Sequence, residues 1–250
     1  MPEPIRKAIV VGASSGIGAA IAKRLAADGA YVAVVARRDD ELQRLCDEIN
    51  QQAGEERAMP FVHDVRNRDE LPLLFQDIAR RLDGLDTIFY AAGVMPEVEP
   101  NEYSTDKDAL MIEVNTIGAM AWLNEGAKRF ERMGEGRLVG ISSIAGDRGR
   151  RGNPAYCTSK AAMNTFLESL RNRLEVKGVS VTTIKPGFVD TVMTKGKPGL
   201  LWLISPEDAA KKIVSASLKN KNTAYVPGQW RLVGTIIRSI PSFLFKRINI

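Results

Sequence analysis

The chain has 250 residues, of which 44% are hydrophobic and 26% charged, and its formal net charge is +5. This is the composition of an ordinary globular protein, without an apolar run long enough to span a bilayer. One histidine, His63, argues against a histidine-based metal site, and Cys46 and Cys157 form no metal or disulfide pattern, so we predict no metal and a cytoplasmic location.

Short β-branched runs alternate with helical patterns along the chain. The expected strands are residues 8–11, 31–36, 59–62, 87–91, 137–141, 179–184 and 223–226. The expected helices begin near 16 and near 39–40, cover about 69–82 and 106–133, and include one that carries Tyr156 and Lys160. This alternation predicts an α/β fold: a doubly wound, Rossmann-type parallel sheet flanked by helices on both faces. We expect one domain, residues 1–250, with a distinct C-terminal segment at about 229–250.

A glycine-rich turn follows the first strand and opens the first helix. Such a turn lets a phosphate approach bare backbone N–H groups at a helix N-terminus. The spacing is G-x-x-x-G-x-G, which differs from the common G-x-G-x-x-G dinucleotide motif. The residues expected to bind the cofactor here are Gly12, Ser14, Ser15, Gly16, Ile17 and Gly18.

The end of the second strand discriminates between the two nicotinamide cofactors. NAD-binding folds place an acidic residue there for the ribose 2′-hydroxyl, whereas this chain has Arg37 and Arg38 after Ala36. An arginine can bind a 2′-phosphate with parallel hydrogen bonds. The sequence therefore favours NADP(H) over NAD(H). In the alternative interpretation both arginines are solvated, and Asp39 is the ribose ligand or a helix cap.

Tyr156 and Lys160 lie four residues apart and would share one face of a helix. A positive charge close to a phenol favours the phenolate and lowers its pKa from about 10. The pair would then exchange protons near neutral pH. By itself a Tyr-x-x-x-Lys is weak evidence, because such pairs are commonly solvated.

These motifs together resemble the short-chain dehydrogenase/reductase family, over roughly residues 7–191. The glycine turn matches the family's cofactor glycines, and Ser143 precedes Tyr156 by the family's usual 13 residues. By this resemblance the catalytic residues are Asn115, Ser143, Tyr156 and Lys160. The remaining cofactor contacts are Asp64, Val65, Ala92, Gly93, Asn115, Tyr156, Lys160, Pro186, Gly187, Val189 and Thr191.

The resemblance implies hydride transfer between the nicotinamide and a carbonyl or secondary alcohol. Ser143 would polarise the substrate oxygen and Tyr156 would protonate it. Lys160 would lower the pKa of Tyr156 and bind the nicotinamide ribose, and Asn115 would kink its helix and hold a water. Two positions depart from the family pattern: Val11 replaces a common threonine, and Tyr90-Ala91 replaces Asn-Asn.

Three loops beyond the strand ends would determine the substrate. Residues 94–105 are proline-rich and acidic, and residues 147–153 carry Arg148, Arg150 and Arg151. Residues 190–205 hold an apolar cluster that includes Leu200–Leu203, which suits a mobile lid over an apolar small-molecule substrate. The arginines would instead suit an anionic or carrier-linked substrate.

The C-terminal segment mixes apolar residues with cations. No acidic residue follows Asp208, and eight Lys or Arg residues do, so residues 1–208 carry −3 of the total +5. The segment would lie on a membrane interface that contains anionic lipid, or pack on the body or on another subunit of a homodimer or homotetramer. We expect no nucleic-acid partner, because no binding motif accompanies the charge.

Two rival functions share some of these motifs. One is a non-catalytic NADP-binding regulator, against which the complete set of four catalytic positions argues. The other is a nucleotide-sugar epimerase or dehydratase, which shares the Tyr-x-x-x-Lys but usually has a different glycine spacing and a longer C-terminal substrate region.

Overall fold

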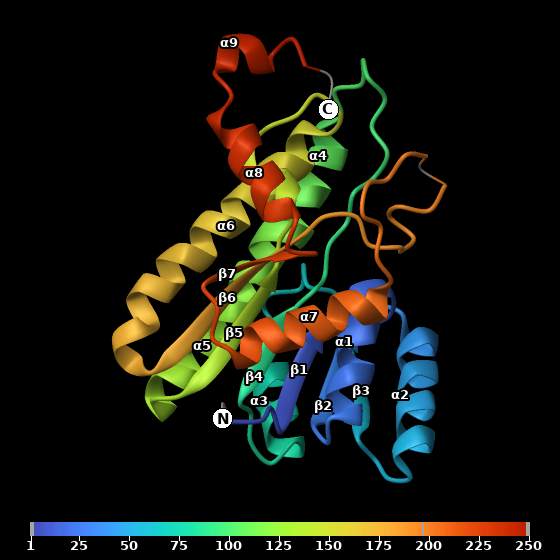
Figure 1. Ribbon diagram of the computed structural model, residues 1–250. Helices are drawn as coiled ribbons and strands as arrows, with labels where there is room; N and C mark the ends of the chain where they lie inside the picture. The colour runs from blue at the N-terminus through green and yellow to red at the C-terminus, as the bar shows by residue number, and fades with distance from the viewer. Residues whose placement is uncertain (1–2, 197, 249–250) are drawn as a thin grey trace.

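The computed structural model describes residues 3–196 and 198–248 (Figure 1). One sheet contains seven parallel strands in the order β3-β2-β1-β4-β5-β6-β7. Their bounds are β1 Lys7–Val11, β2 Tyr31–Ala36, β3 Ala58–Val62, β4 Thr87–Tyr90, β5 Gly136–Ile141, β6 Val179–Pro186 and β7 Thr223–Val226. The predicted doubly wound fold is confirmed.

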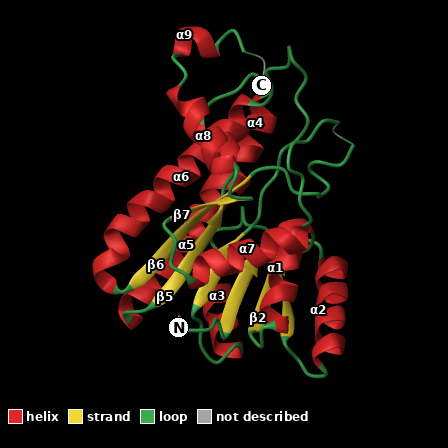
Figure 2. Cartoon of the chain, viewed as in Figure 1, coloured by secondary structure: helices red, strands yellow, loops and turns green. Residues whose placement is uncertain are grey.

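Helices cover both faces of this sheet, as Figure 2 shows. One apolar core lies under α1 (Gly16–Ala27), α2 (Asp39–Ala53) and α7 (Pro206–Leu218). The other lies under α3 (Leu71–Arg81), α5 (Gly118–Met133) and α6 (Pro154–Leu174). The central strands are buried on both faces, which explains why their sequences are almost continuously apolar.

The predicted long helix at about 106–133 is a continuous helical stretch with a change of geometry in its middle. It begins as α4 (Thr105–Ile112), continues through a π-helical segment at Glu113–Ile117, and resumes as α5. Asn115 lies at the centre of the π-helical segment and is fully buried. Single π turns of this kind are frequent at functional sites.

The C-terminal segment forms two further helices, α8 (Trp230–Ser239) and α9 (Ser242–Phe245). Pro241 separates them, as expected of a residue that cannot continue a helix. In Figure 1 both helices lie beyond the carboxyl ends of the strands, at the same end of the molecule as the loops after β4, β5 and β6. No helix within residues 3–196 and 198–248 has the length and apolar character needed to cross a membrane.

Candidate active site

The glycine turn packs closely against neighbouring backbone atoms, so two of its positions have no room for a side chain. Gly12 has φ of +85°, and a methyl group there would lie 2.3 Å from the backbone nitrogen of Ala92. A methyl group at Gly18 would lie 2.2 Å from the carbonyl oxygen of Gly12. Gly16, with φ of +55°, faces Thr191. The predicted residues Gly12, Gly16, Ala92 and Thr191 are therefore brought together, and they leave a bare backbone cradle that fits a dinucleotide phosphate.

Arg38 lies directly against this turn. Its guanidinium donates hydrogen bonds to Ser14 Oγ (2.8 Å) and Ser15 Oγ (2.9 Å), so a positive charge is held at the edge of the cradle. The structure thus connects three residues that the sequence predicted separately. Asp39 belongs to the first turn of α2 and makes no side-chain cap there.

Arg37 has a different environment, which it shares with Asp64. The Arg37 guanidinium lies 3.9 Å from the Asp64 carboxylate, and Arg66 binds the same carboxylate at 2.6 Å. The hydrogen bond from Arg66 holds the pKa of Asp64 below its ordinary value. Val65 is buried and packs against α5 at Gly118.

A cavity of about 770 Å³ opens next to the glycine turn, at the carboxyl ends of β4, β5 and β6. Of the predicted site residues, those that line it are Ile17, Gly93, Ser143, Tyr156, Lys160, Pro186, Gly187, Val189 and Thr191. Three of the four expected catalytic residues therefore share one cavity. The fourth, Asn115, lies behind its wall.

The start of α6 fixes the position of Tyr156. Asn153 is the N-cap, and its Oδ1 accepts a hydrogen bond of 2.9 Å from the Tyr156 backbone N–H. Pro154 occupies the first helical position. The Asn-Pro pair is a start signal that the sequence displays, and one helical turn later Lys160 lies on the same face as Tyr156.

Asn115 joins three parts of the site through its side-chain amide. Its Oδ1 accepts from the Val94 N–H (2.7 Å), and its Nδ2 donates to the Val94 carbonyl (2.9 Å) and to Ser159 Oγ (3.0 Å). Both amide hydrogens are thus used within the protein. Asn115 fixes the strand-end loop at Gly93-Val94 against α6, a role that the sequence did not reveal.

Burial controls the protonation of the Tyr156–Lys160 pair. It raises the pKa of the Tyr156 phenol, and the hydrogen bond with Ser143 and the charge of Arg150 oppose this rise. Burial also lowers the pKa of Lys160 to about 8, and Lys160 Nζ donates to the Ile141 carbonyl oxygen at 3.0 Å. Lys160 Nζ lies 5.8 Å from the centroid of the Tyr156 ring.

The depressed pKa of Lys160 predicts a specific dependence of stability on pH. Lys160 releases its proton near pH 8 in the folded chain and near its ordinary 10.5 in the unfolded chain. Between these values Lys160 binds more protons in the unfolded chain, so its contribution to the free energy of unfolding rises with pH, by roughly 3 kcal/mol in total. Denaturant unfolding from pH 7 to 10.5 should show this rise as a difference between the wild type and Lys160→Met. Burial raises the pKa values of Cys46, Tyr90 and Tyr225, and these groups lower the free energy of unfolding at high pH in both proteins.

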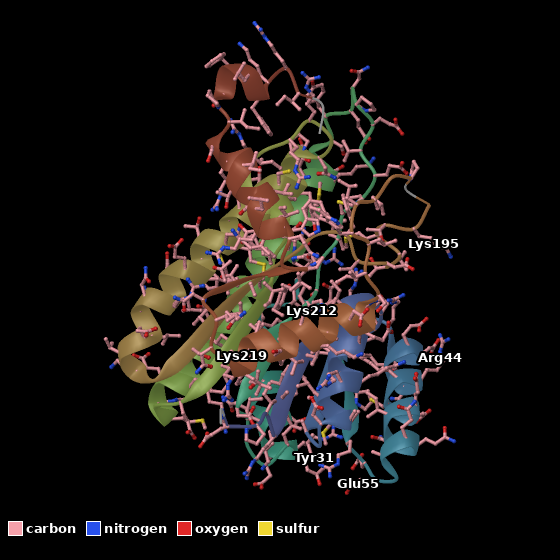
Figure 3. All side chains as sticks on the ribbon, in the orientation of Figure 1. Tyr31, Arg44, Glu55, Lys195, Lys212 and Lys219 are labelled. Atoms are coloured by element: carbon pink, nitrogen blue, oxygen red, sulfur yellow. The ribbon has the colours of Figure 1, made fainter. Side chains whose placement is uncertain are left out.

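Lys160→Met should lose this contribution to the free energy of unfolding, and Lys212→Met should retain it. Lys212 is an exposed lysine on α7 and is labelled in Figure 3. The prediction fails if the Lys160→Met and wild-type curves remain parallel over this range.

The three arginines of the loop at 147–153 have separate roles. Arg148 donates to the Ile237 carbonyl oxygen (2.7 Å) and its guanidinium lies 4.0 Å from the Phe245 ring centroid. Arg151 donates to the Lys246 carbonyl oxygen. Arg150 lines the cavity. By sequence, these arginines would suit an anionic or carrier-linked substrate. Of the three, only Arg150 lines the cavity where a substrate could meet it.

The two parts of the loop at 190–205 also have different environments. Asp190 N donates to the Ile204 carbonyl oxygen (2.9 Å), which closes the base of the loop. Val192 and Met193 line the cavity. Leu201–Leu203 face outward instead, with exposed fractions of 45–63%. Of the apolar residues expected to form a lid, Met193 lines the cavity and Leu201–Leu203 do not.

Two contacts between the site and the C-terminal segment were missed by sequence reasoning. A side-chain carbon at Gly187 would lie 1.9 Å from the Trp230 indole nitrogen, so Gly187 is needed where α8 crosses the site. The Asp147 side chain is buried and binds Lys185 and the Tyr225 hydroxyl (2.8 Å), beside Gly234 of α8. Because the partners of Asp147 lie at least 38 positions away, no local pattern indicates this network.

Comparison with known families agrees with this geometry. A model described as "short chain dehydrogenase" matches residues 6–198. An uncharacterised oxidoreductase of Mycobacterium tuberculosis is 28% identical over 97% of this chain and 96% of the relative. Another, from Staphylococcus aureus, is 32% identical over 86% of this chain and 92% of the relative.

Solved structures show the same fold. A short-chain type dehydrogenase/reductase from Mycobacterium marinum superposes with a TM-score of 0.80 and 25% identity, covering 88% of this chain and 92% of that one. An actinorhodin polyketide ketoreductase with NADPH gives a TM-score of 0.79 and 25% identity, covering 91% and 98%.

Proposed function

Because this chain belongs to the short-chain dehydrogenase family and is an NAD(P)-dependent oxidoreductase, we propose that it acts with NADP(H) on the carbonyl or secondary alcohol of an apolar substrate. Tyr156 is the general acid/base. The observation that carries the proposal is the meeting of Ser143, Tyr156 and Lys160 in one cavity beside the glycine turn.

The chain's own residues bind the substrate oxygen and move its proton. Ser143 Oγ and the Tyr156 phenol converge on this oxygen, and Ser143 stabilises the charge that develops there. Tyr156 donates the proton during reduction and accepts it during oxidation. Lys160, whose pKa is near 8, is able to pass a proton at neutral pH and would hold the nicotinamide ribose. When bound, the nicotinamide supplies or accepts the hydride.

The cavity wall supports an apolar substrate. Besides Val192 and Met193, it includes Ile144, Phe188 and Val98. The test is NADPH oxidation with ketones of increasing chain length, compared with acyl thioesters. Turnover that does not increase with apolar length would contradict the apolar-substrate part of the proposal.

The preference for NADP(H) is supported by the positive charge near the glycine turn. Arg38 is already bonded to Ser14 and Ser15, while Arg37 is more than half exposed and remains available to a 2′-phosphate. We expect NADPH to bind more tightly than NADH, and Arg37→Ala to reduce this preference about tenfold, the value of one charged hydrogen bond. Fluorescence titration of both cofactors measures the ratio.

Arg44→Ala is the matched control for the cofactor titration. Arg44 is exposed on α2, pairs with Glu41 and points away from the sheet in Figure 3, so its removal should leave the ratio unchanged. Equal dissociation constants for NADPH and NADH in the wild type would rule out the preference.

The proposed partners are a small-molecule carbonyl or alcohol and further copies of the chain, as a homodimer or homotetramer. The proposed location is the cytoplasm, with peripheral contact at a membrane surface through the C-terminal segment. The family generally acts on small molecules and is often oligomeric, which supports the first two assignments.

A further inference from the structure

The C-terminal helices expose a row of large apolar side chains. Trp230 and Gly234 of α8 are buried against the body, whereas Leu232 and Ile236, on another side of the helix, are 68% and 53% exposed. Phe243 on α9 is 61% exposed. We call the exposed apolar residues of residues 230–248 the tail face; its members are Leu232, Ile236, Phe243, Leu244 and Ile248. Contiguous exposed apolar side chains commonly mark an interaction site.

The charged side chains within the tail itself are all cations. These exposed residues are Arg231, Arg238, Lys246 and Arg247, and the chain has no Asp or Glu after Asp208. If this face met itself across a two-fold axis in a second copy of the chain, like charges would be brought together. The tail face is complementary to a partner that has a negatively charged surface with an apolar interior beneath it. An anionic lipid bilayer has both properties.

The tail face is held rigidly with respect to the cavity. The Arg148 guanidinium donates to the carbonyl oxygens of Ile237 and Ile240, at the end of α8, and stacks on Phe245 of α9. Arg148 follows the short 3₁₀ helix at Ile144–Asp147, whose N-cap is Ser143. A body that docks through the tail face would therefore fix the orientation of the cavity as well.

Residues near the base of the loop at 190–205 pack against the buried side of α8. The rings of Trp202 and Trp230 are 5.3 Å apart in an edge-to-face contact, and Leu201 and Leu203 beside Trp202 are exposed. Lys195, on the cavity-lining part of the same loop, projects from the outer edge of the molecule in Figure 3. Exposed apolar and cationic side chains thus lie on both the tail and the loop that covers the cavity.

We propose that the tail face docks on an anionic bilayer and thereby holds the mouth of the cavity close to the membrane surface. The substrate is then a ketone or secondary alcohol carried on a lipid dissolved in that bilayer. The assignment of the substrate rests on the proposed oxidoreductase function, whereas docking can be measured without any turnover.

Docking is tested by co-sedimentation of the full-length protein with two kinds of vesicle: pure phosphatidylcholine, and phosphatidylcholine mixed with phosphatidylglycerol. The wild type should bind the mixed vesicles only, and less at high salt. Leu232→Ser with Ile236→Ser should lower the partition coefficient at least about tenfold, because two large apolar side chains no longer enter the interface.

A matched control variant exists elsewhere on the surface. Leu73 on α3 is 74% exposed and belongs to neither the tail nor the loop, so Leu73→Ser should bind vesicles like the wild type. Failure of the wild type to bind mixed vesicles would overturn the proposal. Equal binding by the tail variant would overturn it too, as would a change in oligomeric state in place of a loss of lipid binding.

Activity measurements on two ketones distinguish a failure of the docking proposal from a failure of the proposed oxidoreductase function. The tail variant should reduce a short water-soluble ketone at the wild-type rate, and should lose most of its activity toward a long-chain ketone embedded in mixed vesicles. Equal loss on both ketones would contradict membrane delivery. A wild type that binds vesicles but reduces no carbonyl compound would refute the oxidoreductase proposal and leave docking intact.

Discussion

Replacement of Tyr156 by phenylalanine is expected to lower kcat for carbonyl reduction by about 10³-fold, because the proton donor to the substrate oxygen is lost. The ring remains to fill its place between Ser143 and Lys160, so the dissociation constant for NADPH should change little. Steady-state rates of NADPH oxidation and a fluorescence titration of NADPH measure the two quantities separately.

Tyr103→Phe is the control for this experiment. Tyr103 is 96% exposed, so removal of its hydroxyl should change neither quantity. If Tyr156→Phe keeps more than about a tenth of the wild-type kcat, Tyr156 is not the general acid, since such a group contributes at least about 10²-fold. A second tyrosine is not available in the cavity to replace it, because Tyr156 is the one tyrosine among the described residues that line it.

Asp147→Asn is expected to cause a large loss of stability. The Asp147 carboxylate is 2% exposed and pairs with Lys185, whose side chain is 10% exposed. Loss of the negative charge leaves the Lys185 ammonium buried without its counter-charge, which costs about 3–5 kcal/mol in comparable pairs. Urea unfolding at pH 7 should show a corresponding fall in the free energy of unfolding.

A second substitution tests the physical reason. Asp147→Asn combined with Lys185→Met removes both charges and should recover much of the lost stability, because no unpaired charge remains buried. Glu48→Gln, which breaks the exposed pair between Lys23 and Glu48, should cost less than about 1 kcal/mol. A double variant as unstable as Asp147→Asn alone would show that the charge is not the cause.

Local patterns in the sequence were sufficient to locate most of the fold. Strands β2 (31–36) and β7 (223–226) begin and end at the predicted residues, and the other strands differ by one or two positions. The central strands are buried on both faces, so each of them is a short apolar run bounded by turn residues. The π-helical segment around Asn115 lies inside an uninterrupted helical pattern, and neither its existence nor its limits follow from that pattern.

Neighbouring residues of the same type have different roles in the structure, because each contacts a different segment that is far away in the sequence. Arg148, Arg150 and Arg151 read as one basic loop, yet Arg148 and Arg151 bind the backbone of residues about 90 positions later and Arg150 lines the cavity. Likewise, Met193 and Leu201 belong to one apolar loop, but only Met193 lines the cavity. Their roles depend on which segment packs beside them.

The sequence by itself determined the family and the parallel α/β fold and predicted the residues of the candidate site, because glycine turns, helix starts and Tyr-x-x-x-Lys spacing act over a few residues. The tertiary structure decided the electrostatics of that site and the place of the C-terminal segment. Burial governs the pKa values of Tyr156 and Lys160, and burial is a property of the packed chain. In the same way, Gly187, Asp147 and Trp230 acquire their roles only when α8 crosses the end of the sheet.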